Sequence, residues 1–419
     1  MGELTVTRAV KSEQDESAEA VPAEERPVAP RKRIWRRWRR PSGPFAWGAL
    51  VVLAATVTAM IWTYASTHQI FPDSQWYLIY TYHYMGYDKA HGEQIVLDYI
   101  RDHGTFAPYD YLWASKPFTL SYRPRILLPL LSIPWVALFG PGGIVVVPGI
   151  AFVVAMFLIY RFATIHASVP ASVAAGVLAV VSPLIAKWCV GGLTDSLALM
   201  LHTATLLLLP WRKPATKWTV AGLALVAFLV GTARVITPYT VATVAAVWLW
   251  AMWRERERWR SWTAAAAGAA VGVIAGAIWS KEVSAPLSSR DHFFSMTQGR
   301  ARTLGEAMPW YREVVPTAIA REATAVLSSW PLVLLLVLSI VASVVAWRTV
   351  VPWLVASAWA GAIGIFLIAP YMTMFRYELP MLPALVVAVA VLLDRTAKGL
   401  LPAFQRPSPE PTPSPGGSG

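Results

Sequence analysis

Long apolar runs alternate with short polar connections along this chain, from Phe45 almost to the C-terminus. The hydrocarbon core of a bilayer is about 30 Å thick, so a helix that crosses it needs roughly 20 apolar residues. The recurring runs therefore predict an all-α, polytopic transmembrane bundle of about ten spans. The expected spans are residues 45–64, 142–162, 170–188, 195–210, 217–234, 237–253, 262–280, 325–346, 350–369 and 378–394.

Lysine and arginine residues fix the expected orientation of these spans. One set of connections holds Arg161, Arg212, Lys213, Lys217, Arg254, Arg256, Arg258, Arg260, Arg348, Arg395 and Lys398. The short connections on the other side hold only Lys187, Arg234 and Arg376. Because cytoplasmic loops carry an excess of Lys and Arg, the pattern predicts a multi-pass protein of the plasma membrane with both termini in the cytoplasm.

The apolar stretch 124–139 does not fit this count. Counting it as a span would reverse the side of every later loop and place the basic turns outside. The stretch is short and carries Pro124, Pro129 and Pro134. We expect it to lie along the outer leaflet or dip into it, which is tolerated where protein buries the backbone polar groups.

Composition supports a membrane protein, since 56% of the 419 residues are hydrophobic and only 14% are charged. Residues 1–44 are expected to form a disordered cytoplasmic tail, acidic up to Pro30 and then basic over residues 31–40. Membrane topology explains the formal charge of +12 without nucleic acid as a partner, and the basic run is expected to meet anionic lipids. Residues 45–398 would form the transmembrane domain and 399–419 a second disordered tail. The single cysteine, Cys189, excludes a disulfide framework.

Two long segments, 65–123 and 281–324, are expected outside the membrane. The first is rich in aromatic residues and contains a helical pattern from His91 to His103 with one apolar face. This juxtamembrane helix is expected on the bilayer surface. The second segment, which contains His292, is either a lid over a substrate or a solvated loop whose arginines meet lipid headgroups.

Four motifs occur in order along the chain. They are Asp73 after the first span, the segment Tyr122–Leu130, the segments Ser182–Leu184 and Leu193–Leu197, and the segment Arg376–Pro383. Together they resemble the integral-membrane GT-C glycosyltransferases, a superfamily that includes protein O-mannosyltransferases and lipid A aminoarabinose transferases. The resemblance covers most of residues 45–394. It implies a polyprenyl-phosphate-sugar donor, a glycan, lipid or protein acceptor, and a catalytic acidic residue in the first outer loop.

That chemistry needs a base for the acceptor hydroxyl and cations for the departing phosphate. Asp73 is the candidate base, and burial among aromatic neighbours is expected to raise its basicity. The alternative is that Asp73 caps a surface helix that begins near Ser74. Asp195 is the second catalytic candidate, to orient the acceptor or share a divalent metal such as Mg²⁺ or Mn²⁺ with Asp73. It is equally a helix-capping residue, and Ser74 stands where many relatives carry a second acid.

Other side chains complete the predicted site. Arg376 and Arg234 are expected at the donor phosphate, since the planar guanidinium suits phosphate oxygens, although both also suit snorkelling to lipid headgroups. Lys187 and Arg123 or Arg125 could serve equally well as further cations. The residues expected to bind phosphate or sugar are therefore Arg376, Arg234, Tyr377, Trp76, Tyr77, Trp113, Arg123 and His292.

These features favour a glycosyltransferase that moves one sugar from a polyprenyl-phosphate carrier to a hydroxyl acceptor on the outer face. En bloc transfer of an oligosaccharide is less expected, because the 399–419 tail is not a globular domain. The alternative is a multi-span lipid or sugar transporter, or flippase. Coupling residues of a transporter are expected near the middle of the membrane, whereas the candidate acids here lie at one face.

Overall fold

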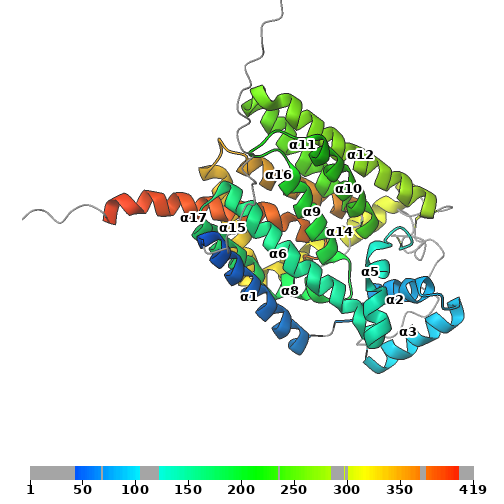
Figure 1. Ribbon diagram of the computed structural model, residues 1–419. Helices are drawn as coiled ribbons and strands as arrows, with labels where there is room; N and C mark the ends of the chain where they lie inside the picture. Colours follow the sequence, from blue (N-terminus) through cyan, green and yellow to red (C-terminus); the bar gives the residue numbers. More distant parts are fainter. Residues whose placement is uncertain are drawn as a thin grey trace, which may run out of the picture. The chain divides into compact units, whose positions relative to one another are not determined.

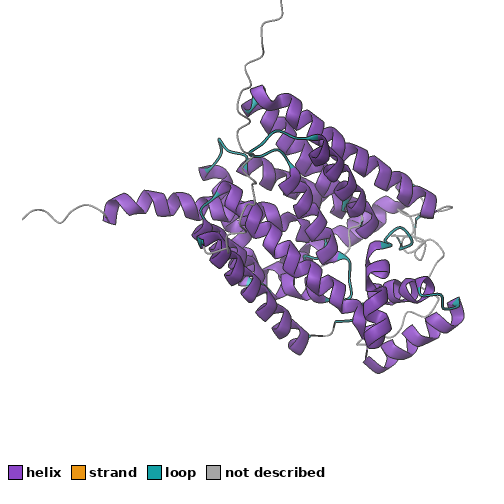
Figure 2. Ribbon diagram, viewed as in Figure 1, coloured by secondary structure: helices purple, strands orange, loops and turns teal. Residues whose placement is uncertain are grey.

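The computed structural model describes residues 43–67, 69–103, 122–234, 236–284, 297, 301–368 and 374–404. Within these ranges all regular secondary structure is helical and no strand occurs, as Figure 2 shows. The all-α class is thus confirmed. Of the expected tails 1–44 and 399–419, residues 1–42 and 405–419 lie outside the described residues, whereas residues 399–404 are helical.

Most expected spans correspond to a helix in the structure (Figure 1). The helices are α1 (Pro44–Ser66), α2 (Pro72–Tyr84), α3 (Lys89–His103), α5 (Leu127–Phe139), η1 (Gly140–Val145), α6 (Val146–His166), α7 (Val169–Val180), α8 (Pro183–Val190), α9 (Asp195–Leu208), α10 (Lys217–Ala233), α11 (Thr237–Arg254), η2 (Arg256–Arg258), α12 (Trp259–Ser284), α14 (Leu304–Leu327), α15 (Trp330–Val345), α16 (Val351–Ile368), η3 (Leu379–Met381) and α17 (Leu382–Phe404). Helix α17 continues past the expected boundary at residue 398.

Two predicted features are more complex than a single straight helix. The expected span 170–188 is broken between α7 and α8, whose axes differ by 73°. Pro183 lies at the start of α8, where its missing N–H does not weaken a helix. The second break, of 102°, separates α14 from α15, so the expected span 325–346 begins at Trp330 instead. Helix α14 occupies most of the described part of segment 281–324.

By length and composition, four helical stretches can cross a membrane, and up to six can if each bent pair is one span. The four stretches are Pro44–Ser66, Leu127–His166, Arg256–Ser284 and Leu379–Gly399. Several of the remaining helices are apolar but shorter. These helices show that the chain is a membrane-spanning protein.

The basic connections come together at one end of the helix bundle, here called the basic end. The Tyr160 hydroxyl donates to the Phe45 carbonyl, which places the end of α6 beside the start of α1. Side chains of Arg212, Arg254, Arg258 and Arg395 then donate to backbone carbonyls of neighbouring helix ends and connections. The carbonyls that accept are those of Thr164, Ile165, Pro210, Trp211, Lys213, Val345 and Arg348.

The opposite helix ends meet at a second pole, here called the site end. The Tyr64 hydroxyl at the end of α1 lies 3.2 Å from both the Val145 and the Val190 carbonyl oxygens. The N–H of Gly192 donates to the Gln69 carbonyl, so the start of α9 lies beside the start of α2. Helices α1 and α6 therefore run antiparallel.

Helix α5 packs against α2 at the site end. The Thr81 hydroxyl lies 3.5 Å from the Pro129 carbonyl oxygen. A Cβ at Gly143 would lie 2.2 Å from the Trp135 carbonyl oxygen. The chain therefore turns back on α5 at Gly140, where φ is +66°, before α6 begins.

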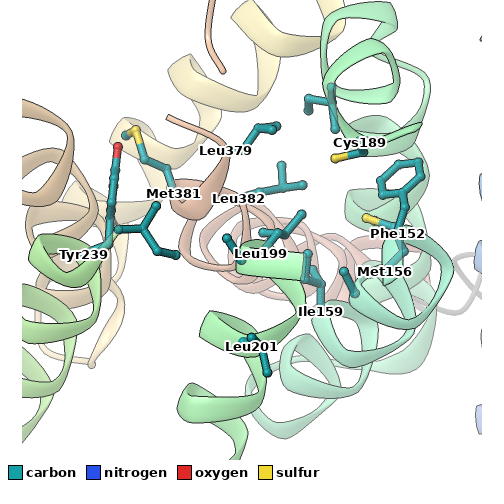
Figure 3. Close-up of a cluster of buried hydrophobic side chains, with 14 of the residues drawn as sticks. Phe152, Met156, Ile159, Cys189, Leu199, Leu201, Tyr239, Leu379, Met381 and Leu382 are labelled. Carbon is teal, nitrogen blue, oxygen red and sulfur yellow. The ribbon is translucent and has the colours of Figure 1, made fainter. Parts of the chain in front are cut away.

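Apolar side chains fill the centre of the bundle. Phe152, Met156 and Ile159 of α6 are buried, and Figure 3 shows them gathered with residues of α9, η3 and α17. Helix α17 is the most enclosed of the candidate spans. This core fixes α9 and the segment before α17, the two elements that bring Asp195 and Arg376 to the site end.

Candidate functional site

Arg376 joins the two candidate carboxylates. Its Nη2 atom lies 2.7 Å from Oδ2 of Asp73, and its Nε atom lies 3.1 Å from Oδ2 of Asp195. The side chain of Asp73 is 20% exposed, that of Arg376 12% and that of Asp195 1%. The structure thus brings together residues from α2, α9 and the connection between α16 and η3, as the sequence predicts.

Asp195 has a second arginine partner. It is the first residue of α9, and its Oδ1 atom lies 2.5 Å from Nη1 of Arg234, which directly follows α10. Thr194 is the N-cap residue and makes no side-chain capping bond. The carboxylate keeps the favourable place at the positive end of the helix dipole. Its side-chain bonds nevertheless go to arginines, so capping does not account for its position.

Asp73 is likewise more than a capping residue. The N-cap of α2 is Phe71, and the hydroxyl of Ser74, not Asp73, accepts the hydrogen bond from the Phe71 N–H. Besides Arg376, the Asp73 carboxylate accepts a 2.9 Å bond from the Tyr122 hydroxyl. Tyr122 is a site residue that the sequence placed only within a motif.

Arg125, and not Arg123, is the arginine of that motif that joins the site. Its Nη1 atom donates to the Tyr77 hydroxyl at 3.2 Å, and its guanidinium lies 4.6 Å from the centre of the Tyr122 ring. Arg123 is exposed and interacts with Tyr80 instead. The turn over residues 122–124, in which the Arg125 N–H donates to the Tyr122 carbonyl, sends the two side chains to different places, and composition could not predict which one joins the site.

The predicted aromatic residues lie beside Asp73 but are enclosed. Trp76 is 8% exposed and Tyr77 is fully buried, and both rings pack on Tyr122 at centroid distances of 6.1 and 5.6 Å. These two rings, packed on Tyr122, enclose Asp73 on one side. Tyr377 contributes its ring face to Arg234, whose guanidinium lies 4.7 Å from the ring centre. Trp113 and His292 lie outside the described residues.

Trp188 on α8 is a site residue that the sequence analysis missed. Its indole N–H donates to the Met374 carbonyl at 2.8 Å, and its ring centroid lies 5.1 Å from that of Phe71. The Arg376 guanidinium lies 5.6 Å from the same ring. The available signal was its place between the two motifs Ser182–Leu184 and Leu193–Leu197.

The charges around Asp73 overturn the expectation that burial makes this residue more basic. Burial by itself raises the pKa of Asp73, but the charges of Arg376, Arg125 and Arg234 outweigh it and lower the pKa to about 2. The prediction that burial makes Asp73 more basic is therefore wrong for the free site. Burial and the adjacent Asp73 charge raise the pKa of Tyr122 well above its ordinary value, so Tyr122 remains a hydrogen-bond donor.

The donor set does not fit a divalent metal between the two carboxylates. The guanidinium of Arg376 already occupies the place between Asp73 and Asp195 that such an ion would take. Among the described residues, no group of three or more His, Cys, Asp or Glu side chains is arranged to hold a metal. The chemistry of this site instead rests on three arginines facing two carboxylates, an excess of positive charge that suits an anion.

Comparisons with known proteins supply no family for the chain. No protein-family model matches it, and no curated protein matches it at a significant level.

Proposed function

We propose that this chain is a membrane glycosyltransferase of the GT-C kind, which moves one sugar from a polyprenyl-phosphate carrier to a hydroxyl acceptor. The observation that carries the proposal is the ion cluster of Asp73, Asp195, Arg376, Arg234 and Arg125. Its three guanidiniums exceed its two carboxylates, and guanidinium pairs readily with phosphate. A phosphate is therefore a better match for the remaining positive charge than a neutral sugar alone.

The position of the cluster favours an outer-face reaction. If the shorter apolar helices also cross the membrane, the chain would make ten passes between the basic end and the site end. These passes would be α1, α6, α7 with α8, α9, α10, α11, α12, α15, α16 and α17. If the basic end is cytoplasmic, as the positive-inside rule expects, both termini are cytoplasmic and the site faces outward. Helices α2, α3, α5 and α14 then lie at the outer surface of the plasma membrane, where lipid-linked sugars are accessible.

In the free site the Asp73 carboxylate is a weak base because Arg376 neutralises it. A donor phosphate that binds Arg376 and Arg234 would share these cations with the carboxylates and so raise the pKa of Asp73. Asp73 then accepts the proton of the acceptor hydroxyl, whose oxygen attacks the anomeric carbon. The bond between that carbon and the phosphate oxygen breaks, and the polyprenyl phosphate leaves with the electron pair, stabilised by the arginines. A single displacement of this kind inverts the anomeric configuration.

The decisive test is transfer from synthetic polyprenyl-phosphate sugars by protein in nanodiscs. We expect Asp73→Asn to reduce turnover by roughly 100-fold or more at equal folded yield, the usual range for loss of a general base. Asp98→Asn is the matched control, because Asp98 is exposed on α3 and its partners within the described part of the chain are Gln94 and Arg101 of the same helix. Equal turnover of wild type and Asp73→Asn would contradict the assignment of the base.

A transporter or flippase is the second candidate, and one observation favours it. His202, in the middle of α9, is buried and lies 3.3 Å from the Thr240 hydroxyl of α11. Buried ionisable residues within membrane helices often belong to transport pathways. Movement of a labelled lipid-linked sugar across the bilayer without any transfer, lost in His202→Ala but not in Asp73→Asn, would support this candidate instead.

A further inference from the structure

The connection that carries Arg376 begins with an unusual backbone. Met374 and Phe375 have φ angles of +52° and +67°, the only positive φ values among the described residues other than glycine. Side chains that carry a Cβ rarely adopt this left-handed region, and two in succession persist only where surrounding groups hold them. The groups that hold these two residues therefore fix the direction in which the side chain of the next residue, Arg376, extends from the backbone.

Glu322 on α14 makes the main contacts that hold the backbone of Met374 and Phe375 in this conformation. Its Oε1 atom accepts a 2.7 Å hydrogen bond from the Met374 N–H, and its Oε2 atom accepts a 2.7 Å bond from the Phe375 N–H. Both carboxylate oxygens are therefore used on two successive backbone donors. Trp188 holds the other side of the same connection through its bond to the Met374 carbonyl.

The two holding side chains come from linked parts of the fold. Trp188 lies on α8, beyond the 73° bend after α7, and Glu322 lies on α14, before the 102° bend into α15. The two bends meet, because the hydroxyls of Ser182 and Ser329 lie 2.9 Å apart and both residues are buried. The connection at 374–375 is thus held from two elements that are themselves joined.

From this geometry we propose that Glu322 is a positioning residue for the ion cluster. It keeps Met374 and Phe375 in the left-handed conformation, which presents the Arg376 guanidinium to Asp73 and Asp195. Glu322 acts through its two bonds to the backbone N–H groups of Met374 and Phe375. Its relevance to phosphate binding rests on the proposed function, whereas its hold on the backbone does not.

The test uses Glu322→Gln in nanodiscs, with Glu313→Gln as the matched control. Glu313 lies on the same helix, is exposed and loses the same charge on substitution. The first measurement is amide hydrogen exchange over residues 374–378. Glutamine has only one carbonyl oxygen, so at least one of the two N–H groups loses its acceptor, and we expect exchange there to become at least tenfold faster than in the control.

The second measurement is binding of undecaprenyl phosphate, which carries the phosphate without the sugar. We expect Glu322→Gln to weaken its binding about tenfold and Glu322→Asp, which keeps both oxygens, to recover part of the loss. Unchanged hydrogen exchange overturns the positioning role. Faster exchange with undiminished phosphate binding also overturns it, since Arg376 would then need no such hold. If the wild-type protein binds no lipid phosphate and Glu322→Gln still exchanges faster, the hold of Glu322 on the backbone is supported. Only the proposed function is then contradicted.

Discussion

Asp73 and Arg376 are 303 positions apart in the chain, and their side chains form a 2.7 Å hydrogen-bonded ion pair. The pair links the first helix after α1 to the segment just before the last helix. Arg376 also contacts Asp195, so one guanidinium connects three distant parts of the sequence.

Removal of Arg376 should destabilise the protein and leave Asp73 without its main partner. A buried ion pair that loses one member typically costs about 3–5 kcal/mol, and the partial exposure of this pair places the cost near the lower limit. Thermal unfolding in one detergent should show a lower melting temperature for Arg376→Ala. The double variant Arg376→Ala/Asp73→Asn should recover part of the loss, because the stranded charge is gone. Strictly additive effects would show that the pair is not coupled.

The ion pair should make stability depend on acidity. The folded-state pKa of Asp73, about 2, lies below its ordinary value of 3.8. The lowered pKa of Asp73 therefore contributes roughly 2 kcal/mol to the free energy of unfolding. This contribution is fully present above about pH 4 and is lost as the pH falls through 2. The difference in melting temperature between wild type and Asp73→Asn should shrink from pH 5 to pH 2. Asp98→Asn, at an exposed position, is the control. If its melting-temperature difference from wild type changed with pH as much as that of Asp73→Asn, a specific role for Asp73 would be contradicted.

Helices α10 and α12 should tolerate no side chain at Gly272. A Cβ there would lie 2.1 Å from the Ala224 carbonyl oxygen, so Gly272→Ala must push the two helices apart. Overpacking of this kind costs about 1–3 kcal/mol. A lower melting temperature and a lower monodisperse yield are expected. Gly222→Ala, whose new Cβ would meet nothing nearer than 3.7 Å, is the control and should behave as wild type.

Accessibility to a membrane-impermeant maleimide should distinguish the two ends of the bundle. The only native cysteine, Cys189, is buried and contributes little background. In intact cells, Lys89→Cys at the site end should react, whereas Lys213→Cys at the basic end should react only after permeabilisation. Both lysines are exposed and both variants remove one positive charge. The reverse pattern would place Asp73 in the cytoplasm and remove the proposed reaction.

Much of the fold could be predicted because membrane insertion imposes a simple rule. The length of each apolar run and the charge of each connection are local properties, and they located most helices to within a few residues. The bends after Val180 and after Leu327 were not predicted, because hydropathy averages over a window and does not report direction. Ser182 and Ser329 are ordinary polar residues until the two bends bring their hydroxyls together.

The sequence by itself determined the helical class, the membrane-spanning character and the identities of Asp73, Asp195, Arg234 and Arg376 as candidates. These follow from residue type and from position relative to apolar runs. Tertiary structure alone decided that Arg125 rather than Arg123 joins the cluster, that Trp188 and Glu322 hold the connection before Arg376, and that Asp73 is more acidic than a free aspartate. The physical reason is that the strength of an ion pair depends on the distance between its charges and on their burial. The distances between segments about 40 to 300 residues apart are fixed only when the helices pack.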